Sequence, residues 1–461
     1  MRAPGLRGTI AAAVVVATGW ITGGCGAQQG EGVDPGSTAG PPPVRTAAER
    51  RALVESYREQ IRRSPDRACR LGRVLGDAEI GFGPQGESLI ASAGLQWLRP
   101  QGSAPPIRRK LGPTSWWPAL GVDGRRVLLA AGVVGKRGSR AEPHKLVLLE
   151  SNNLGETFDR PRLIERSKRW LIDPELLKLR NGMWLLFFTE VNGEANSNRA
   201  TYTVRLFASV DDGKSWKQRA RPLRGPKGVN IEDAQAVEVE DGTVLLVYEH
   251  ETKDRGASTL RQIRSTDRGK TWSKPTTVWD DVPGADVEPG GYLRFDDGEL
   301  WLVASTDEDA VGGSYGRAVV KRKVSRDGGK TWGDKKTLID LQDQIALQAF
   351  ETPSGKVGLL TLRFYGDFEA ESFRTLYRYH LDRDAPPGVF ECTVEEVFAS
   401  GFEDGGLEAW SVVKPGTPKG PANQEPAPKG DPAPKAPETE APETNGEADP
   451  AGSGEGGEGG R

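Results

Sequence analysis

Short apolar runs around a single turn recur along the middle of the chain. Runs such as MWLLFF (183–188) and TVLLVY (243–248) are almost continuously apolar, as expected for strands that are covered on both faces. Each run follows a glycine that is preceded by Asp, Asn or Ser, and this is a strong hairpin signal. The turn glycines are Gly124, Gly182, Gly242, Gly298 and Gly355. The pattern predicts one pair of antiparallel strands around each turn.

An octapeptide of the form S-x-D-x-G-x-[ST]-W repeats in the same units. The copies are SNNLGETF (Ser151–Phe158), SVDDGKSW (Ser209–Trp216), STDRGKTW (Ser265–Trp272) and SRDGGKTW (Ser325–Trp332). The first copy departs from the form, with Asn153 for Asp and Phe158 for Trp. The first residues lie 58, 56 and 60 positions apart (209−151, 265−209, 325−265). A period this regular indicates an array of one supersecondary unit.

The turn and the octapeptide together divide each unit into four short strands. Four-stranded repeats of 56 to 60 residues predict an all-β propeller of antiparallel blades. The five turn glycines account for five blades. Strand-like pieces between Glu79 and Lys110 predict one more, so that we expect six blades, with five as the alternative.

The octapeptide resembles the Asp-box, or BNR repeat, of the sialidase superfamily. The resemblance covers approximately residues 114–398, and it implies a propeller in which the boxes join the outer strands of each blade, away from the active face. We expect the Asp to accept hydrogen bonds from backbone N–H groups, the Gly to adopt a positive φ, and the Trp to pack between sheets. The octapeptide therefore predicts the scaffold and no chemistry.

The segments outside the repeats differ in composition. Residues 1–25 have the pattern of an export signal of the lipoprotein type, with Cys25 as the lipid attachment site. Residues 26–45 predict a flexible linker, and 46–73 a lead-in with a short amphipathic helix. The propeller is expected over 74–399, a short GFE-x-G-x4-W element over 400–413, and a disordered Pro/Glu/Gly-rich tail over 414–461. We expect an exported protein, either secreted or held at the bacterial envelope by its lipid.

Two further cysteines flank the repeats. Cys69 precedes the first blade, and Cys392 lies in the last strand of the last one. Because a propeller must join its first and last blades, and because disulfides persist outside the cytoplasm, we predict a Cys69–Cys392 disulfide that closes the ring. Two buried free thiols are the alternative.

The charge balance bears on partners and cofactors. The net charge is −3, from 62 basic and 65 acidic residues, and no basic patch with interleaved aromatic residues indicates nucleic-acid binding. The three histidines, His144, His250 and His380, are scattered along the chain, so that no metal or other cofactor is predicted. A Ca²⁺ ion held by rim carboxylates is the one alternative.

Acidic residues stand at the entry to the innermost strand of several units. The candidate catalytic residues are Asp173, Glu232, Asp233, Asp286 and Glu288. Glycoside cleavage uses a pair of carboxyl groups, one as proton donor and one as base or nucleophile. Crowded like charges raise the pKa of one member, as a proton donor requires. Solvated rim charge and turn capping are the plainer interpretation.

The resemblance also implies a set of sialidase residues, which this chain keeps only in part. Asp233 stands in the slot of the Glu that pairs with the nucleophilic Tyr, whereas Ala346 occupies the slot of that Tyr. Glu249 stands where the second substrate-binding Arg is expected, and a carboxylate there would repel the carboxylate of a sialic acid. Conventional sialic acid hydrolysis is therefore not expected.

Two functions follow from this reasoning. The first is a glycoside hydrolase of unknown specificity that acts on an extracellular glycan or glycoconjugate. The alternative is a non-catalytic propeller that binds a glycan or a protein. The candidate substrate-binding residues supply aromatic rings or guanidinium groups at the rim, and they are Trp116, Trp117, Arg199, Tyr292, Arg317, Arg363 and Tyr365. Contact with the membrane is expected only through the lipid anchor.

Overall fold

The computed structural model describes most of the repeat region. The described residues are 56, 59–60, 62–64, 69–73, 77–92, 96–101, 104–111, 115–134, 143–193, 199–252, 257–310, 318–341, 344–365, 373–392 and 411–412. The chain divides into two units, 1–416 and 417–461, and every described residue belongs to the first. The candidate lipid attachment site Cys25, the linker 26–45 and the tail 414–461 lie outside the described residues.

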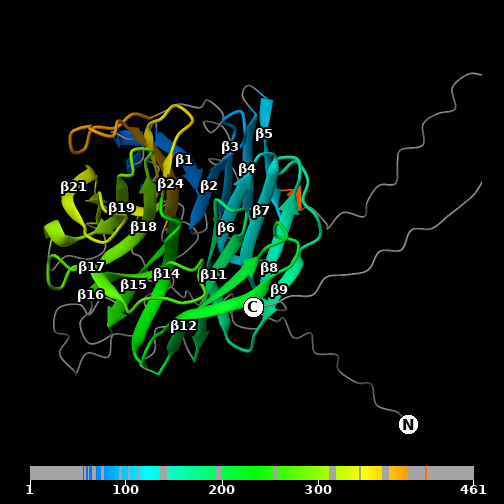
Figure 1. Ribbon diagram of the computed structural model, residues 1–461. Coiled ribbons are helices and arrows are strands. Elements are labelled where there is room, and N and C mark those ends of the chain that lie inside the picture. Colours follow the sequence, from blue (N-terminus) through cyan, green and yellow to red (C-terminus); the bar gives the residue numbers. More distant parts are fainter. Residues whose placement is uncertain are drawn as a thin grey trace, which may run out of the picture. The chain divides into compact units, whose positions relative to one another are not determined.

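The first unit is an all-β propeller whose strands form six sheets (Figure 1). Four sheets contain four antiparallel strands each in chain order. These are β6 (Ser115–Asp123), β7 (Arg126–Val134), β8 (Pro143–Ser151) and β9 (Arg162–Arg166); β10 (Trp170–Lys178), β11 (Trp184–Asn192), β12 (Thr201–Ser209) and β13 (Lys217–Arg224); β14 (Val229–Glu238), β15 (Val244–Thr252), β16 (Ala257–Ser265) and β17 (Thr276–Trp279); and β18 (Val287–Arg294), β19 (Leu300–Thr306), β20 (Val319–Ser325) and β21 (Gly333–Ile339).

The other two sheets join distant parts of the chain. A fifth four-stranded sheet consists of β22 (Gln344–Glu351), β23 (Val357–Tyr365), β24 (Phe373–Leu381) and, at its edge, β1 (Arg70–Arg73). The sixth sheet contains β2 (Ala78–Phe82), β3 (Ser88–Ser92), β4 (Gln96–Gln101) and β5 (Ala104–Lys110). It gains β25 (Ser411–Val412), which pairs in parallel with β5. The predicted blades of four antiparallel strands are thus confirmed for five sheets, and the sixth departs from them by its added strand.

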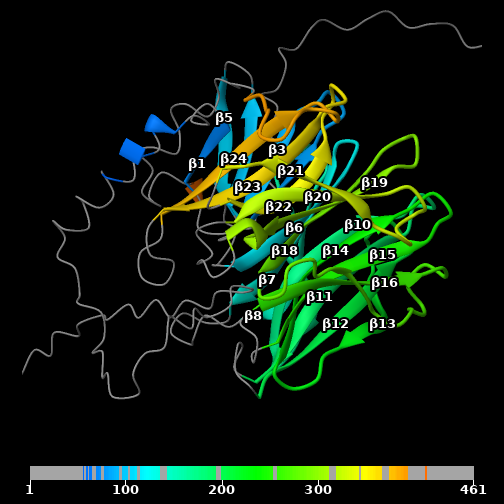
Figure 2. The ribbon, with the colours of Figure 1, turned by 90° about the vertical axis from the view of Figure 1, so that its left-hand side faces the viewer.

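The first strand of each sheet contacts the first strand of the next (Figure 2). Strand β6 contacts β10, β10 contacts β14, β14 contacts β18, and β18 contacts β22. Strand β2 contacts both β6 and β22, so that the sixth sheet lies between the first and last of the five regular blades. The first strands of neighbouring sheets are therefore in contact, and the residues at their entries are brought together.

Two features close the ring near its chain ends. Strand β1 pairs antiparallel with β24, so that a segment from before the first blade completes the last one. Residues 70–73 are thus a strand, although the sequence analysis placed them in the helical lead-in. Next to β1, Cys69 and Cys392 form a disulfide with a Cα–Cα distance of 4.4 Å. The predicted disulfide is confirmed, and the alternative of two free thiols is wrong.

The expected N-terminal helix is not found as an element. In the part of the chain that the structure describes, the helical element is a 3₁₀ turn, η2 (Glu308–Ala310). Ser56, Glu59, Gln60, Arg62 and Arg63 have helical conformation, but the rest of the predicted helix falls outside the described residues. Within those residues, no helix is long and apolar enough to cross a membrane.

The octapeptides form the hairpins between the third and fourth strands of four blades. In the second copy, Ser209 Oγ donates to Asp211 Oδ1 at 2.7 Å, and the N–H of Gly213 donates to Ser209 Oγ at 2.7 Å. Asp212 and Gly213 both have positive φ, as the two central residues of a type I′ turn do. The predicted roles of Asp and Gly are therefore confirmed.

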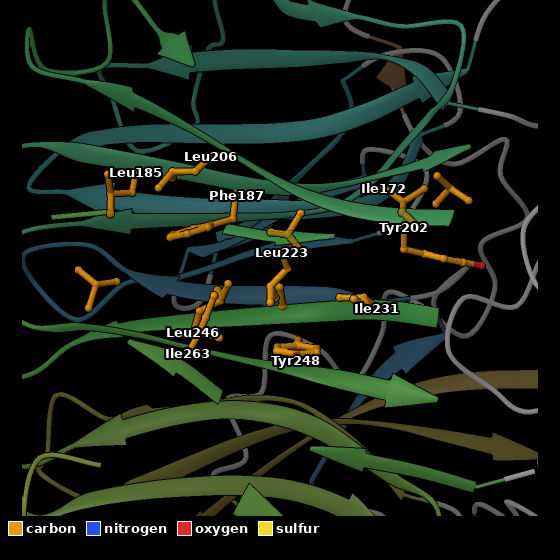
Figure 3. Close-up of a cluster of buried hydrophobic side chains, with 14 of the residues drawn as sticks. Ile172, Leu185, Phe187, Tyr202, Leu206, Leu223, Ile231, Leu246, Tyr248 and Ile263 are labelled. Carbon is orange, nitrogen blue, oxygen red and sulfur yellow. The ribbon is translucent and has the colours of Figure 1, made fainter. Parts of the chain in front are cut away.

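Apolar side chains fill the space between neighbouring blades. Figure 3 shows Leu185 and Phe187 of β11 facing Leu246 and Tyr248 of β15, all of them fully or almost fully buried. The ring of Phe187 also contacts Trp272 of the next blade's octapeptide, with the ring centroids 5.9 Å apart. This contact confirms the predicted packing of the octapeptide Trp between sheets. The apolar interfaces between sheets hold the first strands in place.

Candidate active site

The first strands of the five regular blades share a β-bulge near their entries. The register shifts between Ile172 and Glu175 in β10, and between Glu232 and Gln235 in β14, where two residues of the first strand lie opposite one of the second. Similar shifts occur in β6, β18 and β22. Bulges are common beside active sites, because the additional residue redirects a side chain. The entries of the first strands are therefore irregular at the point where the candidate carboxylates lie.

Asp173 and Asp233 occupy equivalent positions in two adjacent bulges. Both have positive φ, 47° for Asp173 and 52° for Asp233. A residue other than glycine in this conformation costs of the order of 1 kcal/mol, and such residues cluster at functional sites. Their strands β10 and β14 contact each other, so that the two carboxyl groups belong to one site.

A third and a fourth carboxyl group come from one pair of strands. Glu232 of β14 and Glu249 of β15 are directly opposite in the antiparallel register, and both are buried. Like charges directly opposite each other destabilise a sheet, so that the pair is unfavourable unless a proton or a ligand reduces its charge. We define the carboxylate cluster as Asp173, Glu232, Asp233 and Glu249.

Burial and mutual repulsion raise pKa values throughout the carboxylate cluster. Burial raises the pKa of Asp173 well above its usual range, and the charges of Asp233 and Glu232 add to the rise. Burial also raises the pKa of Glu249, with contributions from Asp233 and Glu288. For Asp233, burial and then the charge of Asp77 raise the pKa to about 7. Carboxyl groups of the cluster therefore hold protons at neutral pH, as a general acid must.

Asp286 and Glu288 lie at the entry of the next blade and form a separate group. Burial raises the pKa of Asp286 to about 7, and the charges of Asp307 and Glu251 contribute. The N–H of Ser258 donates to Asp286 Oδ1 at 3.1 Å. Glu288 acts on the cluster through its charge on Glu249. The structure thus brings Asp173, Glu232 and Asp233 together and places Asp286 and Glu288 beside them.

Two further acids connect neighbouring blades. Glu175 Oε1 accepts a hydrogen bond from the N–H of Ala236 in the next blade at 3.2 Å, and burial raises its pKa to about 8. Glu79 accepts a hydrogen bond from the N–H of Leu120 in the same manner. Gln348 Oε1 accepts from the N–H of Ile80 at 2.8 Å. Because these side chains are engaged with backbone groups, we assign them to the scaffold.

Comparison with protein families identifies the repeat. The family model of the BNR repeat-like domain matches residues 87–346, which is more than half of the chain. The chain belongs to the BNR repeat-like family. The predicted BNR repeat propeller is thereby confirmed.

Individual relatives of this BNR repeat-like protein are distant. No curated protein matches the chain. Among solved structures, a protein of unknown function from Dyadobacter fermentans is 13% identical, with 67% of this chain and 98% of that chain covered and a TM-score of 0.48. An α-L-arabinanase of Penicillium chrysogenum, complexed with arabinobiose, is 14% identical (61% and 84% covered, TM-score 0.45). A Trypanosoma rangeli sialidase is 12% identical (67% and 55% covered, TM-score 0.45). Similarities this weak do not indicate the activity of this protein.

The candidate binding residues of the BNR repeat-like protein are scattered. The ring of Tyr292 stacks on Trp332 at 5.9 Å between centroids, and its hydroxyl donates to Gln262 Oε1 at 2.9 Å. This placement makes Tyr292 a packing residue between blades, which the sequence pattern did not indicate. Arg363 is half-buried and donates to Ser64 Oγ at 3.1 Å, and Arg199 is exposed.

The remaining binding candidates are placed only by their backbone. Trp116 and Trp117 lie in β6 at its bulge, and Tyr365 ends β23. Arg317 lies outside the described residues. Trp116 and Trp117 lie at the bulged entry of β6, a strand that contacts β10, the strand of Asp173.

Few positive charges act on the acidic site. Arg374 lowers the pKa of Asp77, although burial outweighs it and leaves that pKa at about 6. Among the described residues, no three His, Cys, Asp or Glu side chains converge as metal ligands do.

A surface hollow of about 490 Å³ lies elsewhere, between the turn at Gly182 and the octapeptide residues Asp211 and Asp212. The hairpin end of the blade thus has a hollow, whereas the titratable groups gather at the strand entries.

Sequence reasoning missed Glu249 as a member of the site. Glu249 lies in the second strand of its repeat, at the position where sialidases have a substrate-binding Arg. It was therefore interpreted only as a residue of the wrong charge. Glu249 lies opposite Glu232 in the antiparallel register, and this pairing makes it a member of the site. The spacing of Glu232 and Glu249 from the turn glycine Gly242 was the signal that could have revealed the pairing. Asp77 was missed because it precedes the first strand-like piece and has no equivalent in the repeats.

Proposed function

We propose that this BNR repeat-like protein is a glycoside hydrolase that acts at the carboxylate cluster. The observation that carries the proposal is the pair Asp173 and Asp233, placed by equivalent bulges on adjacent first strands, each with a raised pKa. Pairs of carboxyl groups whose environments separate their pKa values are typical of glycosidases. The specificity of the enzyme is a separate question.

Different environments divide the roles within the pair. Asp173 is 6% exposed, and burial and the charges of its neighbours raise its pKa well above the usual range, which suits a proton donor. Asp233 is less buried and titrates at about 7, which suits a base or nucleophile. The charge of Glu232 adds to the rise in the pKa of Asp173, and a carboxylate there would stabilise an oxocarbenium-like transition state.

The export and anchoring of the protein are part of the proposal. The confirmed disulfide supports a location outside the cytoplasm, where such bonds persist. A lipid on Cys25 and a glycan or glycoconjugate in the extracellular space fit this location. The contacts of β2 with β6 and β22 also support the sixth sheet as a sixth blade of the ring.

A non-catalytic glycan-binding ring is the second candidate. It is favoured by the use of Glu79 and Glu175 in hydrogen bonds between blades, since these two acids are not free for chemistry. On this alternative, Asp173 and Asp233 would bind a ligand and transfer no proton.

A panel of aryl glycosides, including a sialoside, tests the proposal. We expect turnover of at least one substrate other than the sialoside, and a loss of kcat of about 10²–10⁴ for Asp173→Asn and for Asp233→Asn. Asp296→Asn is the matched control, because this exposed aspartate lies in the turn after β18, away from the strand entries. Turnover of no glycoside would favour the binding ring. Unchanged kcat in both Asn variants would contradict the assignment of the pair.

A further inference from the structure

The outer edge of the blade of β10–β13 carries a surplus of positive charge. Residues 214–227, which contain β13, include six basic and no acidic residues, although the whole chain has a net charge of −3. Five of the six are exposed, and we define them as the basic edge: Lys214, Lys217, Arg221, Arg224 and Lys227. The sixth, Arg219, is half-buried against the octapeptide of the next blade. Most of the positive charge of this segment therefore faces solvent.

Equivalent segments of other blades show that the scaffold does not require this charge. At the same offset from the octapeptide, residues 270–283 include two basic and two acidic residues, and residues 330–343 include three of each. Charges in these segments are paired, since Lys335 Nζ lies 3.0 Å from Asp281 Oδ2 and Arg326 Nη1 lies 2.6 Å from Asp334 Oδ2. An occasional charge is enough to keep an edge strand from pairing with another chain. The surplus on β13 therefore points to a partner.

Within the described residues, no acid neutralises the basic edge. The acids beside it already have partners, with Glu165 Oε2 at 2.9 Å from Arg205 Nη2 and Asp212 Oδ2 at 2.8 Å from Arg126 Nη1. Asp211 accepts hydrogen bonds from hydroxyl and backbone donors of its own octapeptide. None of the five members of the basic edge forms an ion pair with a described residue. The five charges are thus available to an external anion.

The cations lie on both sides of the outer strand. Gln218 faces the preceding blade, because its Oε1 accepts from Arg205 Nη2 at 2.7 Å, and the same nitrogen donates to a glutamate of that blade. Leu223 faces the following blade, where Figure 3 shows it in the apolar cluster between the two sheets. Neighbouring side chains of a strand point to opposite faces. Lys217 therefore lies on the side of the following blade, and Arg224 on the side of the preceding one.

This arrangement fits an elongated polyanion. A flat membrane surface would meet the side chains of one face of the strand only, and membrane-binding surfaces also present aromatic rings. Trp216 is the aromatic residue of the segment, but it is half-buried and donates from Nε1 to the carbonyl of Gly213 at 3.0 Å. The segment thus has no exposed ring on which the bases of a single-stranded nucleic acid could stack. The planar fork of arginine binds carboxylates with two hydrogen bonds.

The basic edge is separate from the carboxylate cluster. In their sheet, β13 is the fourth strand and β10, which carries Asp173, is the first. Three strand spacings of about 4.8 Å separate them by about 14 Å. Salt screens exposed charges over about 8 Å at physiological ionic strength, so that the edge and the cluster act independently. Binding at the edge is therefore a function of its own, which does not depend on the proposed hydrolase.

We propose that the basic edge binds a linear polysaccharide that carries carboxylate groups. The polymer lies along β13, whose eight residues span about 26 Å. Its carboxylates accept charge-assisted hydrogen bonds from Lys217, Arg221 and Arg224. For a protein outside the cytoplasm, as proposed above, this contact would hold the propeller on an acidic matrix.

Titration of the full chain with fluorescently labelled polygalacturonate tests the proposal, with the fully methyl-esterified polymer as its uncharged counterpart. We expect binding of polygalacturonate at about 50 mM salt, and an affinity at least about tenfold lower at about 200 mM, because binding releases counterions. The methyl ester is expected not to bind.

A pair of triple variants locates the contact. Lys217→Gln with Arg221→Gln and Arg224→Gln should lower the affinity about tenfold or more, since three exposed ion pairs are lost. The matched control removes the same charge from exposed positions after two other octapeptide glycines, by Lys270→Gln with Lys274→Gln and Lys330→Gln. Its affinity should stay within about twofold of that of the unaltered protein. Circular dichroism and thermal unfolding check that both variants fold.

Three results would overturn the proposal. They are no binding of polygalacturonate at low salt, equal binding of the methyl ester, and an equal loss of affinity in the two folded triple variants. Phosphatidylglycerol vesicles and single-stranded DNA are the competing probes, and tighter binding of either one than of polygalacturonate would show the partner class to be wrong. The first two results are measured on the unaltered protein, so that a misfolded variant does not protect the proposal. No result depends on turnover, so that the hydrolase and the basic edge fail separately.

Discussion

Within the octapeptide, single residues have roles that the sequence alone reveals. Asp267 accepts hydrogen bonds from Ser265 Oγ at 2.8 Å and from the N–H of Thr271 at 2.9 Å. Arg268 and Gly269, in the turn between these donors, both have positive φ. Every one of these contacts lies within eight residues, so that local turn chemistry determines them. Such roles are predictable because no distant segment takes part.

Replacement of the octapeptide aspartate should weaken the hairpin. Asp267→Ala removes an acceptor for two backbone N–H groups and two hydroxyls, and we expect the free energy of unfolding to fall by about 1–2 kcal/mol. Asp267→Asn should lose clearly less, because Asn153 accepts from the N–H of Thr157 at 2.9 Å in the first copy. Urea unfolding measures both variants. An equal loss in both would contradict this account of the turn.

Residues of the site were only partly predictable. Asp173, Glu232 and Asp233 could be named because they precede a turn glycine at a repeated offset. Their burial, their pKa values and the contribution of Glu249 depend on the register of β14 with β15 and on the next blade. The misplaced candidate Tyr292 shows the same limit, because its contact with Trp332 joins residues 40 positions apart (332−292).

Strands and hairpins were predictable as elements, whereas the bulges were not. The apolar runs and turn glycines indicate the strands through their period. The bulged pairs are Asp173-Pro174, Asp233-Ala234 and Gly290-Gly291, of which two begin with Asp and one with Gly. A bulge arises from the pairing of two strands, so that no motif in one strand marks it. The bulge that directs the candidate carboxylates was therefore not predictable from the sequence.

Arginine side chains connect each blade to the octapeptide of the next. Arg219 of β13 donates from Nε to the carbonyl of Arg268 at 2.6 Å, and Arg162 of β9 donates from Nη2 to the carbonyl of Gly213 at 2.6 Å. In the following blade, Arg264 donates to the carbonyl of Gly328 at 2.8 Å. Three of the four octapeptide hairpins thus receive an arginine donor from the preceding blade.

Loss of one such connection should destabilise the ring. Arg219→Ala leaves the carbonyl of Arg268 without this donor, and we expect a loss of about 1–2 kcal/mol in the free energy of unfolding. Arg221→Ala is the matched control on the same strand, because Arg221 is exposed, and its effect should stay within about 0.5 kcal/mol. Thermal and urea unfolding compare the two variants. Equal effects would show that the contact contributes nothing to stability.

The ring of blades could be predicted from the repeats. The contacts that close the ring could be predicted only in part. The position of the two cysteines outside the repeats indicated the Cys69–Cys392 disulfide. The pairing of β1 with β24 and of β25 with β5 was not predictable, because both strands are short and have no period. Long-range pairing of this kind depends on where the ring brings the chain ends together.

The carboxylate cluster exists only in the assembled ring, because its members come from separate blades. Burial and crowding in the ring keep some of these carboxyl groups protonated at neutral pH. For Asp233, burial raises the pKa from the usual 3.8 to about 7. The group is therefore protonated below that pH and loses its proton as the pH rises through it.

The direct measurement is an NMR titration of the side-chain carboxyl carbons in protein labelled with ¹³C in aspartate. Comparison with Asp233→Asn assigns the signal of Asp233. We predict a midpoint of about 7 for Asp233, well above the usual aspartate value of 3.8. A midpoint for Asp233 at that usual value would contradict this prediction.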